Sequence, residues 1–289
     1  MFCMSHTILL FYIYTPIKEP EVLREAQREL AERLGLTGRL IIAPEGINGT
    51  FEGTSKAIQE YVETMQTDVR FANIDFKTSV GTGTAFPKLS VKVRKEIVAS
   101  SLGEEVNPSV ETGKYLEPDE LHRWYQEGRE FQVVDMRNDY EFVSGHFEGA
   151  IEPGMRNFRD LNEKIGEVEH LKETPVVTVC TGGVRCEKAS AFLKKKGFKN
   201  VYQLKGGIHR YVEKYPGEHF KGGLYVFDGR VVMDTAPEDK KEVIGVCAFC
   251  KALTEEYADD DSVVPSRQIL CCKECLSSQS HLRPARQTH

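Results

Sequence analysis

The chain has 289 residues, with 38 Lys and Arg against 44 Asp and Glu, and so a formal net charge of −6. This length predicts two or three domains, and a content of 40% hydrophobic and 28% charged residues excludes wholesale disorder and a coiled coil. No stretch approaches the ~18 apolar residues of a spanning helix, and without a signal peptide the expected compartment is the cytoplasm. The acidic total argues against a protein that binds nucleic acid through its overall charge.

The first hundred residues alternate strand and helix patterns. Strands are predicted over residues 8–14, 39–43, 75–80 and 88–98, and helices over 20–36 and 55–65. The run Gly46 to Phe51 follows the strand at 39–43, and its dipeptide Asn48-Gly49 predicts a hairpin turn that pairs a further strand segment with it. The order β-α-β-β-α-β indicates a ferredoxin-like sheet, built as a split βαβ, for residues 1–103.

Residues 104–116 are polar and contain Pro108 and Gly113, so we interpret them as a linker. The pattern that follows is typical of a parallel sheet with helices on both faces. Its strands are predicted over 132–135, 175–179 and 201–204, and its helices over 118–127 and 188–196. This α/β domain is expected over 117–221, followed by a cysteine-rich extension over 222–289.

The segment from Val176 to Lys188 carries the strongest chemical signal. A buried strand ends at Cys180, two glycines make a tight turn, and a helix begins. Sites in open α/β sheets gather at the carboxyl ends of strands. Loop amides, the helix N-terminus and Arg185 supply positive charge, which favours a thiolate. Cys180 is therefore the candidate nucleophile, and its loop consists of Thr181, Gly182, Gly183, Val184 and Arg185.

The spacing within this loop separates two chemistries. Five residues lie between the cysteine and the arginine in the phosphate cradle of tyrosine phosphatases, but only four lie between Cys180 and Arg185. The shorter cradle suits a sulfur or a small oxyanion on Cys180 better than a phosphate. A simple core cysteine is the alternative interpretation, which the Gly-Gly turn and Arg185 disfavour.

Four further motifs accompany the loop. They are Asp135-Met136-Arg137, Glu141, the run Gly145 to Ile151, and the run Leu204 to Ile208. Together with the loop they resemble a rhodanese domain. The resemblance implies that Cys180 is the catalytic cysteine and that Asp135, Arg137 and His146 mainly hold loops near the site.

The resemblance extends to the N-terminal region. The runs Ala43 to Thr50 and Phe86 to Lys92 complete a similarity to the bacterial rhodanese-domain tRNA uridine(34) hydroxylases, up to roughly residue 277. That family implies monooxygenase-type conversion of the wobble uridine to 5-hydroxyuridine in the tRNA anticodon loop, with molecular oxygen as co-substrate. The electron source stays open, and the sequence shows no flavin, NAD or haem motif. It predicts no oligomeric state.

A second thiol, Cys186, lies six residues after Cys180 in the first turn of the following helix. One interpretation is a core cysteine that faces the sheet. The other is a resolving thiol that traps an oxidised or persulfidated Cys180 as a disulfide.

Charge is distributed unevenly along the chain. Residues 180–221 contain ten Lys and Arg and three acids, a net charge of +7 that leaves −13 for the remainder. Phosphates near Cys180 would need such a surface, although a solvated helix face is the alternative. The candidate tRNA-binding cations are Lys88, Lys92, Arg94, Lys194, Lys195 and Lys196. The candidates for stacking on an unpaired base, with core packing as the alternative for each, are Tyr202, Tyr211, Tyr215 and Phe220.

Five of the eight cysteines lie near the C-terminus. Cys247-x2-Cys250 and, after 21 residues, Cys272-x2-Cys275 have the spacing of a structural zinc site with four thiolates. Cys271 is an alternative to Cys272 as ligand. Cys3 has no assigned role.

Two other functions compete with hydroxylation. The first is a sulfurtransferase that carries a persulfide on Cys180, the commonest activity of the bare rhodanese domain. The second is a non-catalytic RNA-binding or scaffold module that uses the zinc site and the basic face.

Overall fold

The computed structural model describes residues 5–103 and 105–285. They form two compact units, one of residues up to 99 together with 108–110, and one of residues 100–107 together with those from 111 on. Cys3 lies outside the described residues. Within those residues, no helix has the length and apolar character needed to cross a membrane.

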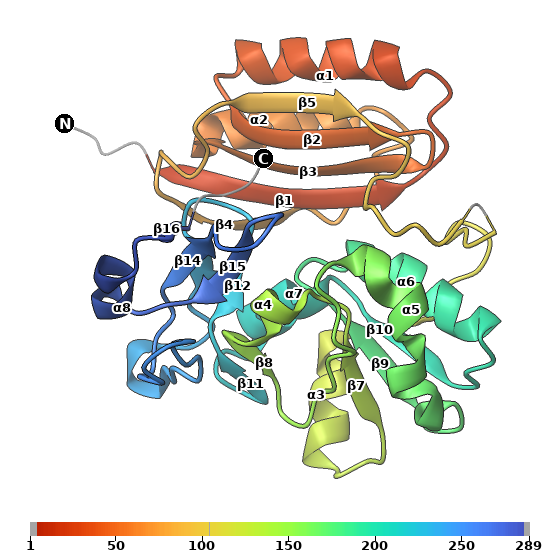
Figure 1. The fold of residues 1–289 in the computed structure, drawn as a ribbon. Helices are drawn as coiled ribbons and strands as arrows, with labels where there is room; N and C mark the ends of the chain where they lie inside the picture. The colour runs from red at the N-terminus through yellow and green to blue at the C-terminus, as the bar shows by residue number, and fades with distance from the viewer. Residues whose placement is uncertain (1–4, 104, 286–289) are drawn as a thin grey trace. The chain divides into compact units, whose positions relative to one another are not determined.

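The first unit is a five-stranded sheet with two helices (Figure 1). Its elements are β1 (His6–Tyr14), α1 (Pro20–Arg33), β2 (Thr37–Ala43), β3 (Gly46–Thr54), α2 (Ser55–Gln66), β4 (Lys77–Gly81) and β5 (Leu89–Val93). The strand order is β4-β1-β3-β2-β5, with only β2 and β5 parallel. The first four strands have the predicted split-βαβ order, and β5 adds an edge strand.

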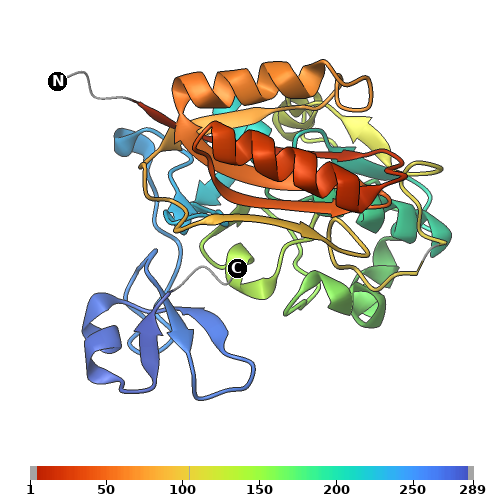
Figure 2. The same cartoon turned by 90° about the horizontal axis from the view of Figure 1, so that it is seen from above.

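Both helices of this unit lie on one face of the sheet (Figure 2). Leu23 of α1 and Tyr61 of α2 are buried in the same core as Phe11 and Phe51 of the sheet. Burial of these side chains drives the packing, because each removes apolar surface from water. Helix α2 begins where the sequence predicts, since the Thr54 hydroxyl oxygen accepts a hydrogen bond from the Ala57 N–H at 3.2 Å.

The predicted hairpin turn at Asn48-Gly49 is wrong. Both residues lie inside β3, and the chain reverses earlier, at Pro44-Glu45. Packing explains the glycine, because a Cβ on Gly49 would lie 2.6 Å from Phe11 Cζ and 2.9 Å from Leu40 Cδ1.

Glu45 in this turn and Asn48 just after it hold the backbone of the segment that follows β5. Glu45 Oε1 accepts a hydrogen bond from the Ile97 N–H at 2.8 Å, and Asn48 Nδ2 donates to the Ile97 carbonyl at 3.0 Å. Both backbone polar groups of the buried Ile97 are thereby satisfied.

The second unit is built on a four-stranded, all-parallel sheet of order β6-β10-β9-β7. Its elements up to the sheet's last strand are β6 (Lys114–Leu116), α3 (Pro118–Gln126), β7 (Gln132–Asp135), α4 (Asp139–Phe142), β8 (Gly145–Phe147), η1 (Phe158–Asp160), α5 (Leu161–Lys164), η2 (Ile165–Leu171), β9 (Val176–Val179), α6 (Val184–Lys195) and β10 (Val201–Leu204). Every residue of β9 is buried, as a central strand covered on both faces requires.

Two predicted boundaries in this unit differ from the structure. Residues 114–116, the end of the predicted linker, form β6 at the sheet edge. Helix α6 starts at Val184, directly after the Gly-Gly turn, rather than at Lys188.

The remaining elements of the second unit follow the sheet in sequence. They are α7 (Gly207–Lys214), β11 (Phe220–Gly222), β12 (Leu224–Tyr225), β13 (Val232–Met233), η3 (Glu238–Lys240), β14 (Tyr257–Asp260), β15 (Arg267–Leu270), α8 (Lys273–Ser278) and β16 (Leu282–Pro284). Strand β11 pairs with β8, β12 with β13, and β14 lies between β15 and β16. The C-terminal extension therefore contains a three-stranded sheet of its own.

Candidate active site and cysteine cluster

Cys180 directly follows the central strand β9, at the carboxyl end of the parallel sheet. Its side chain is fully buried. Gly183 adopts a left-handed conformation with φ of 103°, and its N–H donates to Cys180 Sγ at 3.2 Å. This glycine turns the backbone amide toward the sulfur, as the Gly-Gly turn predicts.

The segment at the start of α7 closes the loop from the other side. The Ile208 N–H donates to the Cys180 carbonyl at 2.9 Å, and the His209 N–H donates to the Thr181 carbonyl at 3.0 Å. Gly207, with φ of +68°, leaves no room for a side chain: a Cβ would lie 2.6 Å from the Cys180 carbonyl oxygen and from the Gly183 nitrogen. The run Leu204 to Ile208, which contains Gly206 and Gly207, thus packs directly on the loop of Cys180.

Arg185 is bound by a carboxylate that the sequence reasoning placed in a motif without giving it a role. Glu141 accepts hydrogen bonds from Arg185 Nη1 at 2.6 Å and Nη2 at 2.8 Å. The carboxylate is fixed in turn by the Asn138 N–H, which donates to Glu141 Oε1 at 3.0 Å. Arg185 therefore presents an oriented guanidinium, but Glu141 neutralises its charge. Only spatial proximity identifies this pair, because 44 residues separate its members.

The two thiols of the site influence each other. Burial alone raises the pKa of Cys180, but a hydrogen bond from the Cys186 side chain, the charge of Arg185 and backbone hydrogen bonds outweigh it and lower the pKa to about 6. Burial and the neighbouring Cys180 raise the pKa of Cys186 well above its ordinary value. At neutral pH the site therefore holds a Cys180 thiolate next to a Cys186 thiol, which suits nucleophilic or redox chemistry.

Asp135, Arg137 and His146 organise the loops around the active site. Arg137, which is fully buried, forms an ion pair with Asp135 at 2.7 Å and donates to the Gly145 carbonyl at 2.6 Å. His146 stacks on Phe142, with ring centroids 4.1 Å apart. These contacts tie the loops after β7 to β8.

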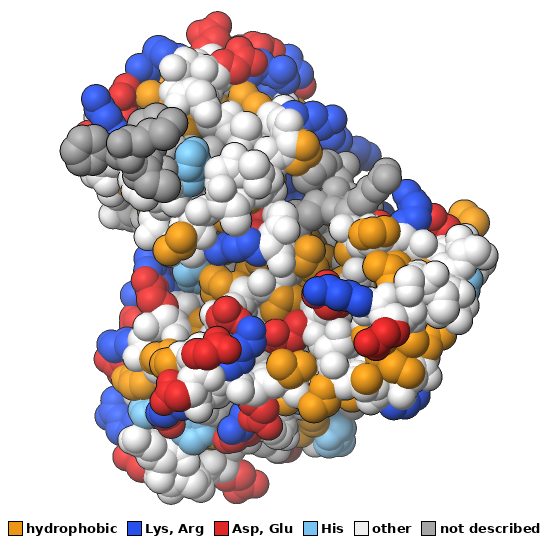
Figure 3. Space-filling model, turned by 90° about the vertical axis from the view of Figure 1, so that its left-hand side faces the viewer, with side chains coloured by type: hydrophobic (Ala, Val, Ile, Leu, Met, Phe, Trp, Pro, Cys, Tyr) orange, Lys and Arg blue, Asp and Glu red, His pale blue; other side chains and the backbone are white. Residues whose placement is uncertain are grey.

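The basic segment 180–221 is largely paired with acids. At least six of its ten cations form ion pairs: Arg185, Lys194, Lys205, Arg210, Lys214 and Lys221. Lys195 donates to the Glu105 carbonyl, whereas Lys196 is exposed. The excess of +7 in the sequence therefore does not amount to seven uncompensated charges in space. Lys and Arg side chains also lie interspersed with Asp and Glu on the left-hand side of the view in Figure 1, which Figure 3 shows.

The other predicted cations are exposed in the first unit. Lys88, Lys92 and Arg94 all have exposed side chains, while the alternate residues Leu89, Val91 and Val93 pack on the core. This is the strand alternation that the sequence predicts.

Two of the four aromatic stacking candidates are core residues. Tyr211 and Phe220 are at most 1% exposed, so neither can stack on an RNA base. Tyr202 packs edge-to-face on Trp124 at 5.1 Å, and Tyr215 stacks on His122 at 3.9 Å. Core packing thus accounts for Tyr211 and Phe220, while Tyr202 and Tyr215 are half-buried and pack against the same core.

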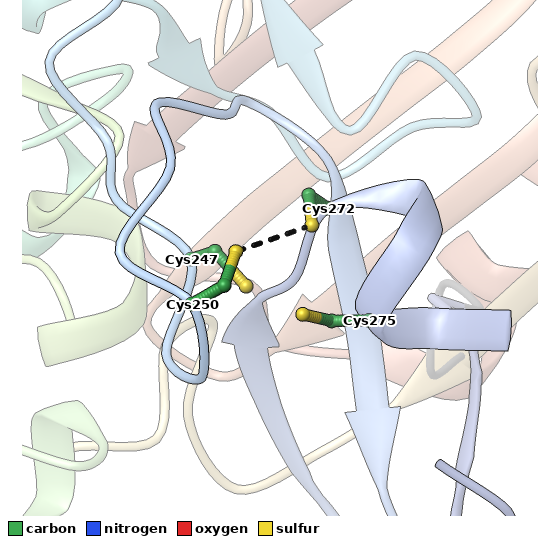
Figure 4. A group of neighbouring side chains, drawn as sticks. All are labelled: Cys247, Cys250, Cys272 and Cys275. Atoms are coloured by element: carbon green, nitrogen blue, oxygen red, sulfur yellow. Dashed lines mark hydrogen bonds between the residues drawn. The ribbon is translucent and has the colours of Figure 1, made fainter. Parts of the chain in front are cut away.

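The four C-terminal cysteines predicted as metal ligands come together (Figure 4). The sulfurs of Cys247, Cys250, Cys272 and Cys275 all lie within 4.8 Å of one another, with 3.6 Å between those of Cys250 and Cys272. Tetrahedral coordination with metal–sulfur bonds of ~2.3 Å needs sulfurs about 3.8 Å apart, so these four fit one ion. Cys271, the alternative ligand, instead directs its sulfur to the Cys272 carbonyl.

Three family models cover most of the chain. Residues 6–97 match the UPF0176 acylphosphatase-like domain, residues 117–214 match the rhodanese-like domain, and residues 221–284 match the rhodanase C-terminal model.

Curated relatives match over almost the whole chain. A tRNA uridine(34) hydroxylase from Cytophaga hutchinsonii is 44% identical over 94% of this chain and 86% of its own length. Proteins of the same name from Aster yellows witches'-broom phytoplasma and Bacillus cytotoxicus are 42% and 41% identical, over 92% and 93% of this chain and 87% and 83% of their own lengths. The chain therefore belongs to the tRNA uridine(34) hydroxylase family.

Proposed function

We propose that this protein is a cytoplasmic, monooxygenase-type enzyme that hydroxylates C5 of the wobble uridine in tRNA, with molecular oxygen as co-substrate and Cys180 as the catalytic residue. The observation that most directly supports this proposal is the environment of the buried Cys180 sulfur. The sulfur accepts a hydrogen bond from the Gly183 N–H at 3.2 Å, and the pKa of the Cys180 thiol is lowered to about 6. The names of the relatives support the substrate.

The chemistry requires two electrons per oxygen molecule. One oxygen atom enters the C5–H bond of uridine, and the other becomes water when two electrons and two protons are supplied. Cys180 and Cys186 can supply the electrons: oxidation of the Cys180 thiolate and the Cys186 thiol to one disulfide releases two electrons and one proton, and water supplies the second proton. An external thiol then regenerates the pair. This gives Cys186 the resolving role, while the core interpretation gives it none.

The test is nucleoside mass spectrometry of unmodified tRNA after incubation with the purified protein and a thiol reductant. We expect 5-hydroxyuridine under air, none under argon, and none with Cys180→Ser. Cys271→Ser is the matched control, since Cys271 lies in the cysteine cluster region, away from the loop of Cys180. Unchanged product with Cys180→Ser contradicts the proposal.

A sulfurtransferase is the second candidate, because a rhodanese-like model covers residues 117–214 and the Cys180 loop forms a short cradle around the sulfur. In that reaction thiosulfate transfers its outer sulfur to the Cys180 thiolate, sulfite leaves, and cyanide then accepts the sulfur as thiocyanate. Rapid thiocyanate formation without tRNA, combined with no 5-hydroxyuridine, favours this candidate.

We assign a structural zinc ion to the four-cysteine cluster. Four thiolates and no open position are typical of structural rather than catalytic zinc. When bound, the ion joins the Cys247 loop to the start of α8. The exposed Lys88, Lys92 and Arg94 are the proposed contacts to the phosphates of the anticodon loop.

A further inference from the structure

A buried glutamate of the first unit holds an exposed loop. Glu52, on β3, is only 2% exposed, although a carboxylate is costly to bury unless its oxygens are hydrogen-bonded. Its Oε1 accepts the Gly83 N–H and its Oε2 accepts the Ala85 N–H, both at 2.7 Å. Hydrogen bonds to a carboxylate are stronger than those between neutral groups, so Glu52 fixes the backbone on both sides of Thr84. We call residues 82–88 the Glu52 loop.

Two further contacts anchor this loop. Ala85 and Phe86 are at most 4% exposed and pack with Ile8 of β1. At the end of the loop, the Lys88 carbonyl accepts a hydrogen bond from the Gly38 N–H of β2 at 3.0 Å. The backbone of the Glu52 loop is therefore held near its start, in its middle and at its end before any ligand binds.

The side chains that the loop presents to solvent suit a phosphate. Thr82, Thr84, Pro87 and Lys88 are exposed. Lys88 is the only charged residue among positions 78–88, and it forms no ion pair within the part of the chain that the structure describes. The acidic Glu52 directs both oxygens to loop amides instead of solvent. Threonine hydroxyls and lysine side chains commonly donate to the phosphate oxygens of nucleic acids, so the loop offers a hydroxyl and a cation to such a group.

The anchoring prepares the loop for binding. A flexible loop loses conformational freedom when a ligand binds it, and this loss weakens binding. Because Glu52 already orders the backbone around Thr84, a ligand needs to order only the side chains of Thr84 and Lys88. The loop leads directly into β5 and its exposed Lys92 and Arg94, the other proposed phosphate contacts. This succession of cations matches a chain of phosphates better than a single small anion.

We propose that Glu52 is a positioning residue for tRNA: it holds the Glu52 loop so that Thr84 and Lys88 bind one phosphate of the RNA backbone. This inference rests on the proposed function, because tRNA is the ligand. It adds Thr84 as a contact and gives the buried carboxylate a role in substrate binding as well as in folding.

The experiment measures the affinity for fluorescent tRNA over a series of salt concentrations. Lys88→Ala should lower the log–log salt slope by about 0.7–0.9, as expected for one lost phosphate contact. Glu52→Gln keeps the shape of the side chain but replaces one acceptor oxygen with an N–H donor, so the loop loses one of its two hydrogen bonds to this side chain. It should lower the slope by a similar amount and weaken binding about tenfold, although Lys88 is still present. The double variant should lose no more than either single variant.

Two further variants separate positioning from stability. Tyr61→Phe removes a buried hydrogen bond to Gln27 Oε1 in the same unit, on the face of the sheet that the helices cover. It lowers stability, but it should bind tRNA with the wild-type affinity and slope. Thr84→Val keeps the shape of an exposed side chain without its hydroxyl, so binding should weaken severalfold with the salt slope unchanged. If circular dichroism shows that Glu52→Gln does not fold, Thr84→Val decides the test.

Several outcomes overturn the inference. They are wild-type affinity and slope in Glu52→Gln, losses that add up in the double variant with Lys88→Ala, a loss in Tyr61→Phe as large as that in Glu52→Gln, and unchanged binding by Thr84→Val. Nucleoside mass spectrometry of tRNA incubated with the wild-type protein separates this failure from that of the proposed function. If the uridine is hydroxylated and one of these outcomes occurs, the role of Glu52 alone is wrong; if tRNA is neither bound nor hydroxylated, both proposals are wrong.

Discussion

Glu141 binds both terminal nitrogens of the Arg185 guanidinium, at 2.6 and 2.8 Å. The side chain of Glu141 is fully buried and that of Arg185 nearly so. As a unit the pair is neutral, so Glu141 offsets part of the attraction between the Arg185 charge and the Cys180 thiolate. The hydrogen bond from Cys186 then becomes a main cause of the lowered pKa of Cys180.

Glu141→Gln should destabilise the protein by about 3 kcal/mol or more, because it leaves the buried charge of Arg185 without its counter-charge. The measurement is the free energy of unfolding from chemical denaturation. Glu148→Gln is the control, since the Glu148 side chain is 45% exposed and its pairs with His219 and Lys221 are surface contacts, typically worth about 1 kcal/mol or less. Equal losses in the two variants would contradict the assigned role of Glu141.

Cys186→Ala should raise the pKa of Cys180. In the wild type the thiolate is present above about pH 6 and is lost as the pH falls through that value. Without the Cys186 donor the midpoint of the Cys180 titration moves to higher pH. Ultraviolet absorbance of the thiolate against pH measures the midpoint, with Cys271→Ala as the control. An unmoved midpoint in Cys186→Ala would show that Cys186 does not stabilise the Cys180 thiolate.

Gly207→Ala should disrupt the active-site loop. Its Cβ would lie 2.6 Å from backbone atoms of Cys180 and Gly183, and the neighbouring helix start cannot move without breaking hydrogen bonds. We expect at least a 100-fold loss of hydroxylation, a factor equivalent to about 2.7 kcal/mol.

Gly197→Ala provides the comparison for this glycine. Gly197 also has a positive φ, of +90°, but no atom lies within 4 Å of its added Cβ. The Gly197→Ala variant should lose only about 1–2 kcal/mol of folding stability, because alanine is strained at a positive φ. It should keep its activity. Equal loss of activity in both variants would show that conformation rather than contact with the loop is responsible.

Metal content should depend on Cys272 but not on Cys271. The purified protein should hold about one zinc ion per chain, and Cys272→Ser should lose most of it, because three thiolates bind structural zinc less tightly than four. Cys271→Ser should retain the ion. Elemental mass spectrometry gives the zinc-to-protein ratio, and the reverse pattern would exchange the two assignments.

A triple variant with alanine at Lys88, Lys92 and Arg94 should bind tRNA more weakly than the wild type. Its binding should also depend less on salt concentration. Each lost phosphate contact lowers the log–log salt slope by about 0.7–0.9. Alanine at Lys194, Lys195 and Lys196 should have a smaller effect, because Lys194 pairs with Glu111 at 2.8 Å and Lys195 donates to the Glu105 carbonyl. Loss of binding only in the second triple variant would favour the basic face of α6 and the RNA-binding alternative.

Much of the fold could be predicted from local patterns. Strand β7 (Gln132–Asp135) and strand β10 (Val201–Leu204) lie where the apolar runs predict them, and the Thr54 cap marks the start of α2. The prediction of a hairpin turn at Asn48-Gly49 was wrong because Gly49 is required for close packing against Phe11. A local turn pattern does not contain information about such tertiary contacts.

The nucleophile of the site could be predicted, but its surroundings could not. Cys180 and its loop are contiguous in the sequence, and their spacing carries the signal. The Glu141 partner of Arg185 comes from a segment 44 positions away in the sequence. Counting charges along residues 180–221 likewise overlooked partners such as Glu111 and Glu117, which lie outside that segment.

The complete burial of Cys180 gives its sulfur protection as well as reactivity. A thiolate that persists at neutral pH would, on an open surface, react with any peroxide or electrophile in solution. Here the loop itself and the start of α7 lie around it, so the sulfur has no exposed surface in this structure. Contact with a uridine base therefore requires these segments to move, which would tie exposure of the thiolate to the binding of its substrate.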